Sequence, residues 1–274
     1  MAALAGLLDR LRAEPSRTGS VILTVYGDAI APRGGEAAMA DLLVLGRALG
    51  VADGVVRTAV SRLARDGWLE RHRQGRHSFY RLAPGRAAEF GAAAPRIYAR
   101  PDPVWGGGVW LAWPDPGPSR RALEEAGWAL AAPGVLVAPD GAVEPGGDVL
   151  HVHATGGAGA MQALAARAWP LARLDASYAR FVDTFGPLAL DGLPPLDAMA
   201  ARVLLLHEHR RVALRDPRLP GAMLPEGWHG AEAWALCARL YKALAPASEA
   251  WLDGVHCRTG PLPRGPDPAG RFGV

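Results

Sequence analysis

The segment from Leu42 to Leu82 constrains the fold more than any other part of the chain, because it combines two helical patterns with two strand-like runs. Leucines recur at helical spacing up to Leu49, and Gly50 then supplies a residue that readily takes the positive φ at which helices end. Asp53 is expected to cap a second helix, because its side-chain oxygen can accept an unpaired N–H of the first turn. The segment therefore predicts two helices joined by a tight turn.

The second helix is expected to divide into an apolar face and a basic face. Val56, Val60 and Leu63 lie at positions i, i+4 and i+7, so they form a stripe that requires burial. The opposite face carries arginines and hydroxyl groups, namely Arg57, Thr58, Ser61, Arg62 and Arg65. Arginine can bind guanine in a fork, and a hydroxyl can reach a base edge or a phosphate, so this face suits the major groove of DNA.

Two strand-like runs follow the second helix, WLERHR and HSFYRL, on either side of Gln74-Gly75-Arg76. Their apolar positions do not alternate cleanly, so the sequence leaves the register of the two strands open. A basic ribbon after a helix-turn-helix is typical of the wing of a winged helix-turn-helix, which reaches the phosphate backbone or the minor groove. The candidate wing contacts are Arg73, Arg76 and His77.

The basic charge of the chain belongs to its N-terminal part. Residues 1–85 hold 12 arginines against 8 acidic residues, whereas residues 86–274 hold 18 basic and 19 acidic residues. This distribution is expected if only the N-terminal part meets a polyanion. The alternative is a solvated basic face in a protein that has 29 arginines and one lysine.

Other protein classes are disfavoured by composition. Cys237 and Cys257 are too few for a disulfide framework or a four-ligand zinc site. No apolar run approaches the 18 or more residues of a membrane span, and the N-terminus has no signal-peptide cleavage pattern. We therefore expect a cytoplasmic protein that does not enter a membrane.

The middle of the chain alternates strand-like and helix-like runs. Trp105, Val109, Leu111 and Trp113 follow a period of two, and Ser119 is expected to cap a helix that runs through Trp128. GVLVAP and DVLHVHA are two more strands before a helix from Met161 to Ala168. The order β-α-β-β-α is compatible with a ferredoxin-like α+β sandwich. The pattern from Asp175 onward is helical, with one helix expected to end at Pro246. The last residues, 260–274, are rich in proline and glycine, and we expect them to be disordered.

The sequence predicts an α+β protein of three domains. A winged helix-turn-helix DNA-binding domain is expected at residues 17–85, a ferredoxin-like domain at 96–172, and a helical C-terminal domain at 173–256.

Several segments spread over most of residues 17–245 form a joint pattern: GDAIAPRGG, VVRTAVSRLARDGWLERHRQGRHSFYRL, RIY at Arg96–Tyr98, the strand with Trp105 and Trp110, GVLVAP, the Tyr178 and Phe181 pair, and HEHRRVALRDPRLPGAMLPEGWHGAEAWALCARLY. In these segments the chain resembles the PaaX family, whose members repress phenylacetic acid catabolism. The resemblance implies a winged helix, a middle domain similar to the CRISPR adaptation protein Cas2, a helical C-terminal domain and a homodimer. It also implies a repressor released from double-stranded operator DNA by an aryl-CoA thioester such as phenylacetyl-CoA.

An arginine-rich segment after His207 supplies candidate contacts for such an effector. The candidates are Arg210, Arg211, Arg215 and Trp228, because arginine presents a planar fork to the phosphates of coenzyme A and tryptophan can pack on an aryl group. Structural ion pairs are the competing interpretation, because Glu208, Asp216 and Glu226 lie close in the sequence.

Metal and enzyme interpretations have little support in the sequence. His151 and His153 would share one side of a strand, whereas His207 and His209 would diverge on a helix, and no further ligands accompany either pair. We therefore predict no metal, no cofactor and no catalytic residue. A CoA-thioester-modifying enzyme and a DNA-binding adaptor without an effector are the alternative functions.

Overall fold

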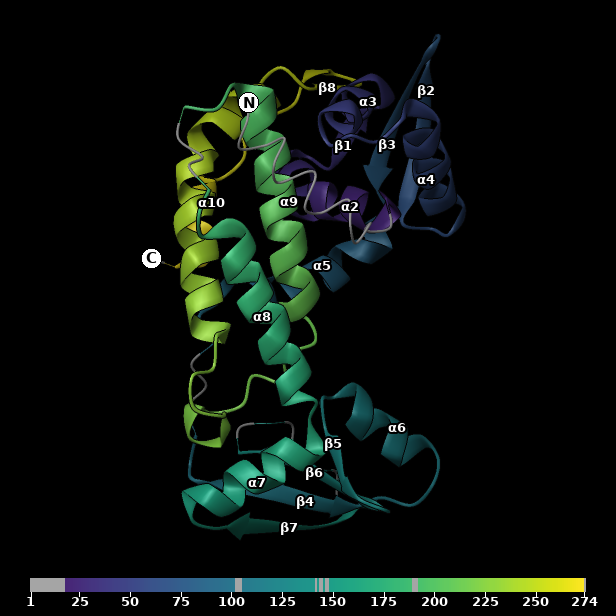
Figure 1. Ribbon diagram of the computed structural model, residues 1–274. Coiled ribbons are helices and arrows are strands. Elements are labelled where there is room, and N and C mark those ends of the chain that lie inside the picture. Colours follow the sequence, from purple (N-terminus) through teal and green to yellow (C-terminus); the bar gives the residue numbers. More distant parts are fainter. Residues whose placement is uncertain are drawn as a thin grey trace. The chain divides into compact units, whose positions relative to one another are not determined.

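The computed structural model describes residues 18–101, 105–140, 142, 145, 148–188 and 192–273 (Figure 1). Helices and strands both contribute to these residues, so the protein is of the α+β class. The chain divides into two compact units. The first unit comprises Met1–Arg100, Arg180–Leu214 and Glu232–Val274, and the second comprises Pro101–Ala179 and Arg215–Ala231.

The first unit begins with helices and a small sheet. Its elements are α2 (Thr18–Val25), η1 (Tyr26–Ile30), η2 (Ala31–Arg33), β1 (Glu36–Ala38), α3 (Met39–Ala48), α4 (Asp53–Arg65), β2 (Leu69–Gln74) and β3 (His77–Leu82). Val56, Val60 and Leu63 are buried, which confirms the predicted apolar face of α4. Helices α3 and α4 approach so closely that a Cβ on Gly46 would lie 2.6 Å from Val56 Cγ2. A glycine is therefore required at this contact.

The predicted cap of α4 is wrong. Ala52 is the capping residue, no side chain caps the helix, and Asp53 is its first residue. The Asp53 carboxylate instead accepts two hydrogen bonds from the Arg47 guanidinium, at 2.8 and 2.7 Å, across the turn that Gly50 makes with a φ of 72°. An arginine fork outcompetes a backbone N–H for a carboxylate because both partners are charged.

The sheet of this unit is antiparallel, in the order β1-β3-β2. Leu69 pairs with Leu82 and Gln74 with His77, which settles the register of the hairpin and leaves Gly75 and Arg76 as its two-residue turn. Phe79 and Tyr80 are adjacent in β3 and both are buried. Because adjacent strand residues face opposite sides, both faces of β3 are covered there, and this explains the broken alternation in the sequence. Strand β1 was not predicted.

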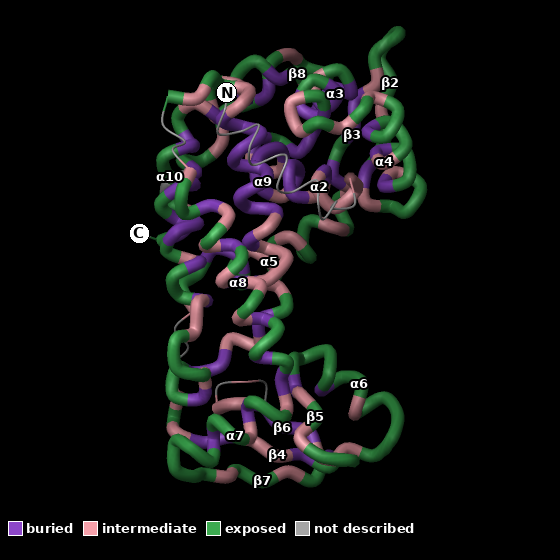
Figure 2. Tube along the Cα trace, in the orientation of Figure 1, coloured by how far each residue is buried: buried purple, intermediate pink, exposed green. Residues whose placement is uncertain are grey.

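Long helices complete the first unit. They are α5 (Ala87–Tyr98), which follows the short η3 (Pro84–Arg86), α9 (Pro195–Ala213), α10 (Gly230–Leu252) and the end of α8 (Leu171–Phe185). Helix α9 is buried on nearly all sides from Ala198 to His207 and packs against α2 and α3 (Figure 2). A helix buried on nearly all sides belongs to a core, and α9 is the central helix of this unit even though it also buries Arg202 and His207.

Two expectations about the C-terminal part are wrong. Helix α10 does not end at Pro246 but continues to Leu252, and the ring of Pro246 is exposed, so the carbonyl group that it deprives of a partner faces water. Residues 260–273 are ordered, with β8 (His256–Cys257) paired to β9 (Gly260–Pro261) and a short helix η5 (Pro268–Phe272). Phe272 is only 3% exposed, so burial of its ring holds this segment in place.

The second unit contains a four-stranded antiparallel sheet in the order β5-β6-β4-β7. Its elements are β4 (Gly108–Trp113), α6 (Pro118–Glu125), β5 (Ala129–Ala132), β6 (Val135–Pro139), β7 (Leu150–Thr155), α7 (Ala158–Ala168), the start of α8, and the short helix η4 (Gly221–Met223). Leu123, Trp128 and Leu136 pack together with Ala112, Ala138 and Val149 as its core. The predicted strands and helices are present, but Ser119 does not cap α6, because the N-cap is Gly117 without a side-chain hydrogen bond, and α6 ends at Glu125 and not at Trp128. Strand β5 was not predicted.

Candidate nucleic-acid interface and adjoining cavity

The exposed face of α4 carries every side chain that the sequence proposed for it. Arg57, Thr58, Ser61, Arg62 and Arg65 are all exposed, because the buried stripe fixes the rotation of the helix about its axis. A helix entered through a tight turn, with its apolar side on α2 and α3, presents this basic face to solvent.

The tip of the β2–β3 hairpin is a second basic surface. Arg73, Arg76 and His77 are exposed at or beside the two-residue turn. Arg71 donates a hydrogen bond of 3.0 Å to Ser78 Oγ on the facing strand, so its guanidinium is tied to the hairpin. The hairpin therefore holds its free arginines at the tip.

The exposed arginines of α4 and of the β2–β3 hairpin differ in whether they form an ion pair with a carboxylate. Within the described residues, no ion pair joins Arg57, Arg62, Arg73 or Arg76 to a carboxylate. Arg65, in contrast, pairs with Asp66 at 3.2 Å, an exposed contact of the kind that contributes little. The Thr58 hydroxyl donates to Gly54 O at 2.8 Å, so only its acceptor lone pairs are available to a partner.

The Arg47–Asp53 pair positions the start of α4, and sequence reasoning missed it. The pair lowers the pKa of Asp53 below its ordinary value, chiefly through the hydrogen bond from Arg47, and raises the pKa of Arg47. The six-residue separation spans a turn, so no helical or strand period reveals it. Arg47 is therefore engaged in the turn itself.

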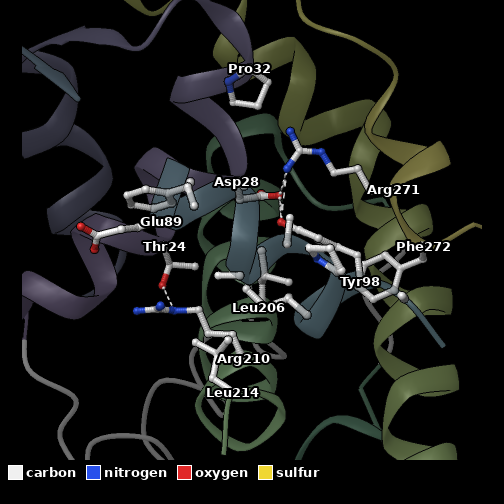
Figure 3. A pocket seen from close by; sticks show the side chains of 18 of the residues that line it. Thr24, Asp28, Pro32, Glu89, Tyr98, Leu206, Arg210, Leu214, Arg271 and Phe272 are labelled. Atoms are coloured by element: carbon white, nitrogen blue, oxygen red, sulfur yellow. Dashed lines mark hydrogen bonds and ion pairs between the residues drawn. The ribbon is translucent and has the colours of Figure 1, made fainter. Parts of the chain in front are cut away.

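A cavity of about 1120 Å³ lies within the first unit (Figure 3). Its walls come from α2, η1, η2, α5, α9 and the C-terminal segment, with Trp68 from the turn before β2 and Trp234 from α10. Large apolar side chains dominate the lining: Leu23, Trp68, Phe90, Ile97, Leu206 and Phe272. Segments that lie more than 170 residues apart in the sequence thus build one cavity beside the helix that supports α4.

Arg210 reaches the cavity from α9 and binds α2 through neutral oxygens. Its Nε donates to Thr24 Oγ1 at 2.7 Å, and its Nη2 donates to the carbonyl and hydroxyl oxygens of Ser20, each at 2.8 Å. Thr24 Oγ1 also lies 2.9 Å from Nδ1 of the buried His207. Burial, and the neighbouring charge of Arg211, lower the pKa of Arg210. No ion pair with a carboxylate offsets its charge anywhere in the described residues.

A buried carboxylate, Asp28, also lines the cavity, from η1. Asp28 accepts hydrogen bonds from Tyr241 Oη at 2.7 Å, Arg202 Nε at 2.8 Å, Tyr98 Oη at 2.9 Å and Arg271 Nη1 at 3.1 Å. Burial alone would raise the pKa of Asp28, but Arg202 and Arg271 outweigh it, so the pKa is lowered and the group is ionised. This cluster joins η1 to α5, α9, α10 and the C-terminal segment.

The structure places the four proposed effector contacts separately. Arg210 lines the cavity, and Arg211 pairs with Glu208 at 3.0 Å, which is the ion pair that the competing interpretation anticipated. Arg215 and Trp228 belong to the second unit, where Arg215 is exposed and the Trp228 ring meets the Tyr178 ring at 5.7 Å between centroids.

The histidine pairs do not form metal sites in the part of the chain that the structure describes, where no group of three potential ligands occurs. His207 and His209 are buried, and burial lowers their pKa values to about 3 and about 4, so both are neutral. His153 Nε2 lies 2.6 Å from Asp140 Oδ1. No described helix is both long enough and apolar enough to span a membrane.

Comparison with known proteins gives consistent matches. The family model of the PaaX-like protein matches residues 17–85, and that of the PaaX-like protein C-terminal domain matches residues 169–254. The chain is 32% identical over 270 residues to the transcriptional repressor PaaX of Escherichia coli (strain K12), with 89% of this chain and 85% of the relative covered. Its fold is similar to that of the uncharacterized protein Rv0674 from Mycobacterium tuberculosis, with a TM-score of 0.56, 22% identity, and coverage of 85% of this chain and 97% of that chain.

Proposed function

This chain belongs to the PaaX-like family, and from that premise we propose that it is a DNA-binding transcriptional repressor and not an enzyme. The observation that carries the proposal is the row of exposed arginines on α4, of which Arg57 and Arg62 form no ion pair with a carboxylate among the described residues. An arginine that no carboxylate occupies is free to bind a guanine edge or a phosphate.

In this proposal α3, the Gly50 turn, α4 and the β2–β3 hairpin act as a winged helix-turn-helix. Helix α4 enters the major groove, where Arg57 and Arg62 contact bases and Ser61, Thr58 and Arg65 contact bases or phosphates. The hairpin acts as the wing, and Arg73, Arg76 and His77 contact the phosphate backbone or the minor groove. The division into base and backbone contacts follows from geometry, because a helix fits the major groove whereas a hairpin tip lies beside it.

In this proposal the second unit is the Cas2-like middle domain of the family. Its strand order β5-β6-β4-β7, with β4 central and every pair antiparallel, is the order of a ferredoxin-like sheet, and we assign it to the Cas2-like domain that the family resemblance implies. We propose that the protein is a homodimer, because two copies of one reading helix match the two half-sites of a palindromic operator.

We further propose that the repressed genes belong to aromatic-acid catabolism and that an aryl-CoA such as phenylacetyl-CoA releases the protein from its operator. The family resemblance supports the ligand class. A large apolar cavity in the unit that carries α4 gives such a ligand a place from which to act on DNA binding.

Footprinting of the purified protein on its own upstream DNA tests this function. We expect a protected, two-fold symmetric site that phenylacetyl-CoA abolishes and that free coenzyme A does not. Absence of any protected site would refute the repressor. Protection that no CoA thioester reverses would retain DNA binding and refute the effector.

A further inference from the structure

We propose that the cavity of the first unit is the site that takes the acyl group of the effector, and that Arg210 couples its occupancy to the DNA-reading helix. This inference rests on the proposed function and specifies where and how the ligand acts. The ligand class is an aromatic acyl thioester whose carbonyl oxygen, or an anionic group near it, reaches the Arg210 guanidinium.

The size and lining of the cavity suit an aromatic group attached to a long arm. Ligand pockets commonly enclose roughly 300–1,000 Å³, and about 1120 Å³ exceeds what an aryl group alone fills. Phe90, Ile97, Leu206 and Phe272 supply apolar contact surface from three separate elements. The one acidic group on the buried wall, Asp28, is already neutralised by two arginines, so it does not repel an electron-rich ligand.

Arg210 is the polar feature of the cavity that a ligand would change. Its partners, Ser20 and Thr24, contribute only neutral oxygens, although the guanidinium is partly buried against an apolar lining. A partly buried cation gains more from a charged or strongly polarised oxygen than from a hydroxyl or a peptide carbonyl. A ligand that supplies such an oxygen therefore competes with Ser20 and Thr24 for the same N–H groups.

Ligand binding at Arg210 affects DNA binding through helix α2. Helix α2 packs against both α9, which carries Arg210, and α4, which carries the proposed base contacts. In the ligand-free arrangement the Arg210 hydrogen bonds fix α2 to α9, and α2 supports α4 from its buried side. When the ligand takes these hydrogen bonds, α2 keeps its packing and the Thr24–His207 contact with α9 but loses the three hydrogen bonds from Arg210, so α2 and the α4 helix that it supports can shift. A ligand lowers DNA affinity only if it favours such a DNA-incompetent arrangement.

The cavity can be tested only in the full chain. Residues of α2 and η1 form one wall and residues 271–273 form another, so removing either end of the chain opens the site. Variants of the intact protein are therefore the appropriate probes, and calorimetry with phenylacetyl-CoA together with operator binding by fluorescence anisotropy gives two independent readouts.

The first variant fills the cavity. Ala94 in α5 lines it, whereas Ala92 in the same helix is exposed and does not. We expect Ala94→Phe to bind the operator as wild type does and to bind phenylacetyl-CoA at least tenfold more weakly. Ala92→Phe, the matched control, should behave as wild type in both assays. A folded Ala94→Phe protein with wild-type affinity for phenylacetyl-CoA would overturn the inference and leave the proposed function intact.

The second variant removes the coupling cation. Arg210→Met keeps the aliphatic stem but cannot bind Ser20, Thr24 or the ligand oxygen, and Arg239→Met removes one exposed charge from α10 as its control. We expect Arg210→Met to bind the operator more weakly without ligand, and the further loss caused by phenylacetyl-CoA to shrink to less than threefold. A full wild-type response in Arg210→Met would overturn the coupling role. If wild-type protein itself binds no phenylacetyl-CoA, the proposed effector fails, and the inference fails with it.

Discussion

The buried Asp28 cluster allows one prediction to be worked through in detail. Asp28→Asn removes the charge that Arg202 and Arg271 face, at 2.8 and 3.1 Å, in a site where the Asp28 and Arg202 side chains are 2% and 1% exposed. The new amide also places an N–H₂ donor among groups that are themselves donors, the hydroxyls of Tyr98 and Tyr241. The substitution therefore breaks a buried network from its centre.

The expected loss of unfolding free energy depends on which counterions Arg202 keeps after the substitution. Removing one partner of a buried ion pair typically costs about 3–5 kcal/mol, because the other charge is left buried without compensation. Arg202 retains Glu249, at 2.6 Å, as a second counterion, so we expect the lower end, about 3 kcal/mol. For a chain of this length that corresponds to a decrease in Tm of roughly 6–12 °C.

Thermal and urea denaturation of Asp28→Asn measure this loss, with Asp66→Asn as the control. Asp66 pairs with Arg65 on the surface, where a pair contributes about 0–1 kcal/mol, so its removal should barely change Tm. The stability that the Asp28 charge supplies is fully present above the ordinary pKa of the group and is lost as pH falls through the lowered folded pKa. The stabilities of the two proteins should therefore begin to converge below about pH 4 and meet only below the lowered folded pKa. A loss for Asp28→Asn of less than about 1 kcal/mol at pH 7 would refute the reasoning.

Three further predictions concern the DNA surfaces and a buried histidine. Arg57→Ala or Arg62→Ala should weaken specific operator binding by roughly 1–3 kcal/mol per lost base contact with unchanged circular dichroism, and wild-type binding by both would refute the assignment of α4 to the major groove. Arg73→Ala or Arg76→Ala should weaken binding to all DNA sequences alike and lower the salt-dependence slope by about one unit, whereas an altered sequence preference at constant slope would assign the hairpin to base readout. Burial lowers the pKa of His209 to about 4, whereas the same histidine has a pKa of about 6.5 in the unfolded chain. The free energy of unfolding should therefore be independent of this group above about pH 6.5 and should fall by up to about 1.4 kcal/mol per pH unit between pH 6 and 4. His209→Leu should flatten that acid limb in urea titrations, and an unchanged limb would contradict the assignment.

The candidate DNA surface could be predicted from the sequence because its determinants are local. The i, i+4 and i+7 spacing of Val56, Val60 and Leu63 fixes which side of α4 is buried, and this alone places Arg57 and Arg62 on the exposed side. Glycine at position 50, with its positive φ, ends the preceding helix without help from distant residues.

The cavity and the Asp28 cluster depend on contacts between segments far apart in the chain. Asp28 lies 174 residues from Arg202 and 243 from Arg271, and no periodicity in the sequence relates such positions. The sequence suggested disorder for residues 260–274 because proline and glycine disfavour regular structure. Burial of Phe272 against Tyr98 and Tyr241 overrides that local preference in the described residues 260–273.

The sequence by itself therefore determined helices α3, α4 and α7, five of the strands (β2, β3, β4, β6 and β7) and the basic face of α4, because hydrophobic period and turn chemistry act within a few residues. Tertiary structure alone decided that Arg210 binds Ser20 and Thr24, and that α2, α9 and the C-terminal segment enclose one cavity. The physical reason is that a side chain's partners are set by which buried surfaces meet, and that choice is made by the packing of the whole unit.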